Sequence, residues 1–182
     1  MISHHLDIYL AYFHEMLLQN NRSKLAQLYR LLARIPSGLD TCYDNFEKHV
    51  RQAGLNSVDE TVALAKIPNE KPTMEEPVQR VSVNPTYFSD CLSKVIKEYQ
   101  ALVRVAFNAD KEFNRSIDRA CRAFINWNRA CIYDSDAPEL LAKHTENLLR
   151  RTGGNGTSDS DILGKLVDSV RSSVSLEIVL VS

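Results

Sequence analysis

The sequence lacks several features that define common protein classes. Its four cysteines form no CxxC motif, no apolar run approaches the roughly 20 residues of a membrane-spanning helix, and no basic leader precedes an apolar core. Neither charge sign is in excess, since 22 Lys and Arg oppose 23 Asp and Glu to leave a net charge of −1. These absences argue against a disulfide-rich secreted protein, a membrane protein and a polyanion-binding protein. Reduced cysteines favour a cytoplasmic or nuclear location. The balanced charge and the lack of a membrane-spanning run lead us to expect no nucleic-acid or membrane partner.

Glycine and proline are also few, with six of each in 182 residues, and most fall between segments of helical periodicity. In each such segment apolar residues recur every three or four positions, the spacing of one helix face. No segment shows the alternation of a strand. The sequence therefore predicts an all-α protein of about seven helices whose short connections favour antiparallel packing. The expected helices span residues 3–19, 23–35, 39–53, 84–107, 111–128, 138–152 and 159–173.

Local signals mark where these helices begin and end. Asn21 or Ser23 is expected to cap the second helix, Asn84 stands before a proline at the start of the fourth, and Asp110 precedes the fifth. Gly54 is placed where a glycine commonly follows the last residue of a helix, so we expect the third helix to end there.

The apolar stripes also predict a core and a domain plan. In the second helix the stripe runs through Leu25, Leu28, Leu32 and Ile35. We expect a helical bundle over residues 1–130 that contains a mobile loop at 66–83, two further helices within 137–173, and an irregular tail at 174–182. The structural residues on which rigidity is expected to depend are Leu28, Leu32, Phe88, Val95, Leu102, Phe113, Ile117 and Phe124.

Histidines are the first candidates for chemistry. His4, His5 and His14 lack the spacing of a zinc motif, so surface histidines are the favoured interpretation. His144 lies on the apolar face of its helix and is expected to be a partly buried histidine with satisfied hydrogen bonds.

The other reactive residue types give no stronger signal. Cys91 and Cys121 fall on apolar stripes, where a thiol acts as a small hydrophobe, and nothing marks Cys42 or Cys131 as activated. A glycine-rich stretch, residues 153–156, follows a helix and lacks the phosphate-loop pattern, and the acidic pairs at 75–76 and 159/161 are expected to be solvated. Trp127 is expected to cover the end of a helix hairpin, with an interface anchor as the alternative. We therefore expect no catalytic, cofactor-binding or metal-binding residues and no cofactor.

Three stretches carry a resemblance to a known family. They read LYRLLARIPSGLDTCYDNFEKHVRQAGL at 28–55, NPTYFSDCLSKVIKEYQALVRVAFNADKEFNRSIDRACRAFIN at 84–126 and APELLAKHTENLLRR at 137–151. In this order they resemble the cullin family, the elongated scaffolds of multisubunit ubiquitin ligases. The resemblance covers residues 3–170. It implies an α-solenoid stalk of cullin repeats over residues 3–128, followed by the opening of the family's globular four-helix bundle at 137–173.

The resemblance also implies which partners to expect. The family's adaptor-docking helices correspond to sequence before Met1, and its RING-binding sheet and modified lysine correspond to sequence after Ser182. After Arg171 the family continues with an aromatic and lysine-rich helix, whereas this chain reads SSVSLEIVLVS. A truncated or aberrantly spliced product is therefore expected, which self-associates through apolar faces of residues 1–19 and 159–181.

Three functions remain open. The resemblance favours a non-catalytic scaffold segment of a cullin-RING ubiquitin ligase, acting in ubiquitin-dependent protein degradation. It would hold an adaptor with its substrate receptor, and a RING subunit with its conjugating enzyme, at a fixed separation. The alternative is a free-standing helical protein-interaction module without ligase activity. An enzyme is the least favoured, because no set of convergent titratable residues is evident.

Overall fold

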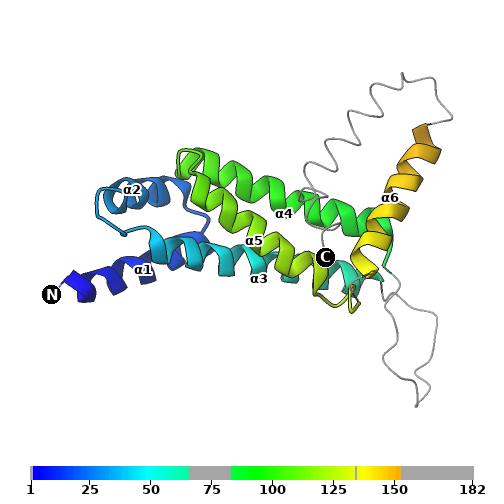
Figure 1. Ribbon diagram of the computed structural model, residues 1–182, viewed down its shortest axis with the longest axis horizontal. Helices are drawn as coiled ribbons and strands as arrows, with labels where there is room; N and C mark the ends of the chain where they lie inside the picture. The colour runs from blue at the N-terminus through cyan, green and yellow to red at the C-terminus, as the bar shows by residue number, and fades with distance from the viewer. Residues whose placement is uncertain (1, 66–82, 134, 153–182) are drawn as a thin grey trace, which may run out of the picture. The chain divides into compact units, whose positions relative to one another are not determined.

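The computed structural model describes residues 2–65, 83–133 and 135–152, and six helices lie within these ranges (Figure 1). No strand occurs in the described residues. The prediction of an all-α chain is confirmed. The helices are α1 (Ile2–Leu18), α2 (Arg22–Leu32), α3 (Asp40–Ala65), α4 (Pro85–Ala106), α5 (Lys111–Asn126) and α6 (Asp136–Thr152).

Three of the predicted caps are present. The Asn21 side chain accepts a hydrogen bond from the backbone N–H of Lys24 at 3.1 Å, which identifies Asn21 rather than Ser23 as the cap of α2. Asn84 accepts from the N–H of Thr86 at 2.9 Å. Asp110 accepts from the N–H groups at the start of α5. Each cap satisfies backbone donors that the first helical turn leaves unpaired.

The predicted end of the third helix is wrong. α3 continues through Gly54 to Ala65, and no glycine among the described residues has a positive φ angle. Gly54 is buried inside the helix. An added Cβ at this position would lie only 2.5 Å from the ring of Phe124. The glycine is needed for close packing and not for a left-handed backbone.

The helices contribute to two compact units. The first comprises Met1–Ala53 and Ile96–Cys121. Its core is an aromatic cluster in which the rings of Phe107 and Phe113 stack with centroids 4.0 Å apart, and Phe46 meets both rings edge-on. Phe13 from α1 lies against the same pair. Tyr29 from α2 also contacts both rings. Such pairs add about 0.5–1.5 kcal/mol each beyond the burial of apolar area, so the cluster ties all five helices into this unit.

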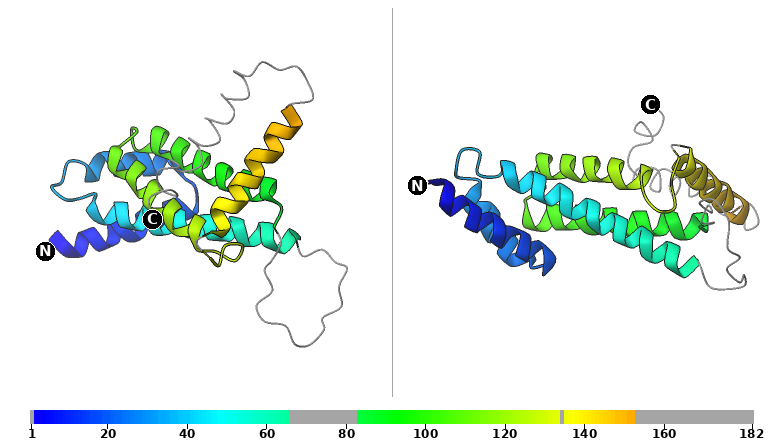
Figure 2. Two further views of the ribbon diagram at one scale, coloured as in Figure 1. Left: turned by 45° about the vertical axis from the view of Figure 1, so that its right-hand side comes forward. Right: turned by 90° about the horizontal axis from the view of Figure 1, so that it is seen from below.

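A tight reversal connects α4 to α5 within the first unit. α4 ends at Ala106 and the chain turns back into α5, so the two helices run antiparallel from this turn (Figures 1 and 2). Asn108 and Ala109 both adopt positive φ angles, of 52° and 55°. The Tyr29 hydroxyl donates a hydrogen bond to Asp110 at 3.0 Å, which fixes the turn to α2.

The second unit comprises Gly54–Val95 and Arg122–Ser182, of which residues 54–65, 83–95, 122–133 and 135–152 are described. Close contact between Gly54 and Phe124 brings α3 and α5 together here. Arg129 forms an ion pair with Asp59 at 3.8 Å. The buried apolar side chains are those of Val58, Val62, Val83, Phe88, Leu92, Val95, Phe124, Ile125, Cys131 and Ala137.

The predicted core is largely confirmed. All eight structural residues named from the sequence are buried. Ile35 is the exception on its predicted stripe, because α2 ends at Leu32 and the following turn leaves 45% of Ile35 exposed. Most of the predicted loop at 66–83, the seventh helix at 159–173 and the tail at 174–182 lie outside the described residues. Val83 lies at the edge of that loop and is buried. The domain plan remains a prediction.

Candidate functional site

The described histidines do not gather into a metal site. His14 is exposed on α1, and its ring meets that of His49 on α3 edge-on, with centroids 6.5 Å apart. Within the described part of the chain, no three His, Cys, Asp or Glu side chains are placed to hold a metal ion. The side chains of His4 and His5 lie outside the description. Sequence reasoning missed His49, since its proximity to His14 arises from the packing of α1 on α3.

Burial raises the pKa of all four cysteine thiols above its ordinary value. Burial raises the pKa of Cys42, Cys121 and Cys131 to about 12. Cys91 is only half-buried, and burial is again the main cause of its raised pKa. Its Sγ donates to the carbonyl oxygen of Phe88 at 3.0 Å. Because the thiolate is the reactive species, these groups are not activated nucleophiles.

His144 is the one described side chain with a buried polar atom that lacks a hydrogen-bond partner. Only 6% of its surface is exposed, and its Nδ1 atom is bonded to no other described residue. Burial lowers the pKa of His144, and the nearby carboxylate of Asp90 on α4 opposes that effect. The expectation of a buried histidine is confirmed, but the expectation that its hydrogen bonds are satisfied is wrong for Nδ1.

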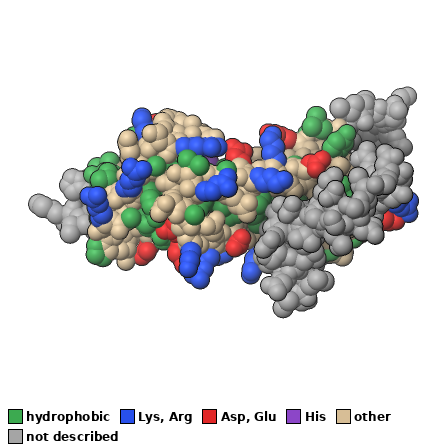
Figure 3. Space-filling model, turned by 90° about the horizontal axis from the view of Figure 1, so that it is seen from above, with side chains coloured by type: hydrophobic (Ala, Val, Ile, Leu, Met, Phe, Trp, Pro, Cys, Tyr) green, Lys and Arg blue, Asp and Glu red, His purple; other side chains and the backbone are tan. Residues whose placement is uncertain are grey.

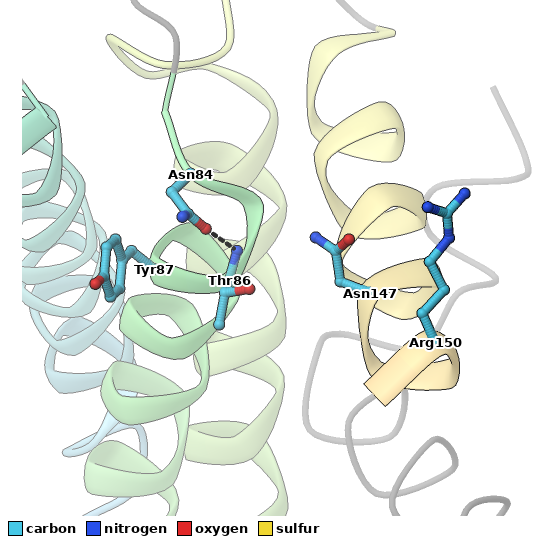
Figure 4. Close-up of a pocket in the computed structure, with 5 residues that line it drawn as sticks. All are labelled: Asn84, Thr86, Tyr87, Asn147 and Arg150. Atoms are coloured by element: carbon cyan, nitrogen blue, oxygen red, sulfur yellow. Dashed lines mark hydrogen bonds between the residues drawn. The ribbon is translucent and has the colours of Figure 1, made fainter. Parts of the chain in front are cut away.

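An open cavity of about 480 Å³ lies in the same unit (Figure 4). It is lined by Asn84, Thr86 and Tyr87 at the start of α4, and by Asn147 and Arg150 on α6. The guanidinium of Arg150 is already paired with Glu146 at 2.7 Å. The lining can therefore hydrogen-bond a polar group, but it offers no nucleophile and no acid–base pair. No sequence motif marks it, because its two sides come from distant parts of the chain.

Trp127 is presented outward on a turn with many hydrogen bonds. The Asn128 side chain donates to the carbonyl oxygens of Phe124 and Ile125, and accepts from the N–H groups of Ala130 and Cys131. With 61% of its surface exposed, Trp127 does not cover the end of a helix hairpin, so that prediction is wrong. The glycine-rich stretch and the acidic pairs named from the sequence lie outside the described residues.

The remaining surface carries charges of both signs and scattered apolar residues. Figure 3 shows Lys and Arg side chains together with Asp and Glu on one face of the molecule. No helix in the described residues is long and apolar enough to cross a lipid bilayer. Exposed large apolar side chains of the first unit include Ile8, Tyr9, Tyr12, Leu31, Ile35 and Val105.

Comparison with known proteins agrees with this architecture. The family model described as the cullin alpha solenoid domain matches residues 1–171. Cullin-1 of Dictyostelium discoideum is 34% identical over 85% of this chain and 18% of its own length. Cullin-1 of Schizosaccharomyces pombe is 31% identical over 92% of this chain and 21% of its own length.

A third relative, Cullin-2 of Caenorhabditis elegans, is 25% identical over 93% of this chain and 19% of its own length. The chain thus spans about a fifth of the length of the relatives it matches. The resemblance drawn from the three sequence stretches is confirmed. The helices, the match to the solenoid domain and the identity to these relatives together show that this chain belongs to the cullin family.

Proposed function

We propose that this chain is a non-catalytic segment of the scaffold of a cullin-RING ubiquitin ligase. In this role it holds a substrate receptor and a RING-bound conjugating enzyme at a fixed separation. The observation that carries the proposal is the match to the cullin alpha solenoid domain over residues 1–171. Solenoids are built from helical units that pack only on their neighbours, which suits them to act as spacers. Tethering two proteins on one spacer raises their effective concentration for each other.

The packing within each unit supports a mechanical role. In the first unit the aromatic cluster joins five helices, and in the second the Gly54–Phe124 contact leaves no space between α3 and α5. Interiors packed this closely resist deformation. The proposed partners are the adaptor with its receptor and the RING subunit, and the proposed location is the cytoplasm or nucleus.

A chimera tests the spacer role. The segment of Dictyostelium Cullin-1 to which this chain aligns is replaced by the corresponding sequence of this chain. The chimera is then purified with the adaptor and RING subunits, and ubiquitin transfer to a receptor-bound substrate is measured. We expect transfer at a rate close to that of the parent. A matched control carries a Gly/Ser linker of equal residue number, which should lower the rate about tenfold or more because its ends sample many separations.

Two results would contradict the proposal. Equal transfer by the Gly/Ser control would show that a fixed separation is unnecessary. A chimera that binds both subunits yet transfers no ubiquitin would show that this sequence cannot act as the spacer. A second control, Leu102→Pro in the chimera, breaks α4 in its interior and should reduce transfer while leaving both docking regions intact.

The second candidate function is a free-standing protein-interaction module. The exposed Trp127, held on a turn that Asn128 fixes by four hydrogen bonds, favours it, since interface anchors are enriched in tryptophan. An inactive chimera together with a partner of the isolated chain that binds in a Trp127-dependent manner would favour this function over the scaffold.

A further inference from the structure

The outer side of α2 combines positive charge with exposed apolar side chains. Residues 16–39 contain four basic residues and no acidic residue. All four are exposed, and three of them, Lys24, Arg30 and Arg34, accompany the exposed Leu31 and Ile35 on this helix and the turn after it. We call these five residues the α2 outer face. No salt bridge is found between its three cations and the acidic groups of the described residues.

The opposite side of α2 is firmly held. Leu25, Leu28 and Leu32 are buried, and Tyr29 is bonded to Asp110. The Asn21 cap fixes the first turn. A rigid element that presents its contact groups in place loses less conformational entropy on binding than a flexible one.

An ordinary solvated surface does not account for this combination. A cation in the last turn of a helix is favoured by the helix dipole, which is reason enough for Arg30. The dipole gives no reason for Leu31 and Ile35, of which 57% and 45% remain exposed. Guanidinium groups beside aliphatic side chains match a segment that carries carboxylates and apolar groups together.

We propose that the α2 outer face is a docking site for an acidic amphipathic segment of a partner protein. Its carboxylates pair with Arg30 and Arg34, its leucine-like side chains cover Leu31 and Ile35, and Lys24 extends the positive charge along the helix. Charge complementarity selects the partner's acidic residues, and the apolar pair selects a protein over a nucleic acid. The site deepens the proposed scaffold function by adding a partner surface, and it rests on that function only for its biological setting.

A membrane surface and a nucleic acid are less well matched. A helix that lies on a bilayer inserts a broad apolar face, whereas α2 buries its main apolar side in the protein and exposes two aliphatic residues. A nucleic acid would leave those two residues without a partner, because backbone phosphates are contacted by polar and charged groups.

The test is fluorescence anisotropy with the full chain and a fluorescein-labelled synthetic helical peptide that carries Glu and Leu on one face. A peptide of the same composition with its Leu residues spread around the helix is the first comparison. Duplex DNA and phosphatidylserine vesicles are the others. We expect the patterned peptide to bind more tightly than any of these, and its binding to weaken as salt is raised.

Paired variants separate the site from general electrostatic attraction. Arg30→Glu with Arg34→Glu should weaken peptide binding about tenfold or more, because it replaces two attractive charges by two repulsive ones. Lys48→Glu with Arg51→Glu makes the same change in charge on exposed positions of α3, and should weaken binding less than about twofold. Leu31→Gln with Ile35→Gln keeps the charge and should also weaken peptide binding. Far-ultraviolet circular dichroism confirms that each variant is folded.

Several outcomes would overturn the inference. No binding of the patterned peptide, or equal weakening by the α2 and α3 charge variants, would show that there is no specific site. Tighter binding to DNA or vesicles, insensitive to Leu31→Gln and Ile35→Gln, would assign the face to a polyanion. Self-association that Arg30→Glu and Arg34→Glu abolish would assign it to a second copy of the chain. A chimera that still transfers ubiquitin in any of these cases leaves the scaffold proposal standing.

Discussion

Gly54→Ala is the substitution that tests the packing of the second unit most directly. Gly54 lies in the interior of α3, and its backbone needs no positive φ angle. By intrinsic preference alone, alanine should therefore stabilise the helix by about 0.5–1 kcal/mol. Packing opposes this gain. The new Cβ would lie 2.5 Å from Cγ and Cδ1 of Phe124, whereas carbon atoms pack comfortably at about 3.5–4.0 Å.

Relief of that overlap requires a displacement of about 1 Å between α3 and the Phe124 ring. The ring is fully buried, so it has no free space into which to turn. Overpacking of this kind costs about 1–3 kcal/mol. After the helix preference is subtracted, we expect Gly54→Ala to lower the free energy of unfolding by about 0–2.5 kcal/mol.

Urea unfolding provides the measurement. Circular dichroism reports on all helices, while the fluorescence of Trp127, the single tryptophan, reports on the second unit. Ala53→Gly is the matched control, since it should cost only the helix preference of about 0.5–1 kcal/mol. In a Phe124→Leu background the clash is reduced, so Gly54→Ala should become neutral or stabilising. If Gly54→Ala stabilises the otherwise unaltered chain, the close contact between α3 and α5 does not exist.

Three further predictions concern the core, the turn after α4 and the buried histidine. Leu102→Ala should lower the free energy of unfolding by about 2–5 kcal/mol because the Leu102 side chain is buried. Val105→Ala, at an exposed position, should cost little. A cost below about 0.5 kcal/mol for Leu102→Ala would refute the place of Leu102 in the core. Ala109→Gly should stabilise the folded protein by about 0.5–1 kcal/mol, because the φ angle of 55° strains alanine but not glycine. Ala109→Val should destabilise the folded protein, and thermal unfolding distinguishes the two outcomes. Burial lowers the pKa of His144 below the ordinary 6.5, so the folded state binds fewer protons than the unfolded state. The contribution of neutral His144 to the free energy of unfolding is fully present above about pH 6.5 and is lost as the pH falls through that value toward the lower folded pKa. Urea unfolding between about pH 7.5 and 5.5 should therefore show a decline in the free energy of unfolding that His144→Gln reduces. A decline that His144→Gln leaves unchanged would contradict this role.

Local features of this protein could be predicted from the sequence because they depend on neighbours along the chain. Helical periodicity placed five of the six helices to within a few residues of their ends, whereas α3 runs well past its predicted end, and the caps at Asn84 and Asp110 depend on donors two or three residues away. The fully buried stripe of α5 was also evident, since Phe113, Ile117 and Phe124 share one face. The same reasoning failed where a local signal has two meanings. Gly54 was read as a helix end, although its small size serves a contact with a distant ring.

No candidate site could be predicted from the sequence, because such a site depends on contacts between distant parts of the chain. The cavity is lined by residues at the start of α4 and on α6. Whether Nδ1 of His144 finds a hydrogen-bond partner depends on which residues pack around it. Residue chemistry alone therefore determined a helical chain with a packable core, and the resemblance of three stretches to known sequences indicated its family. Tertiary structure alone decided which surfaces remain free. The Tyr29–Asp110 bond joins residues 81 positions apart, and only such long-range contacts settle which face of α2 is buried and which is exposed.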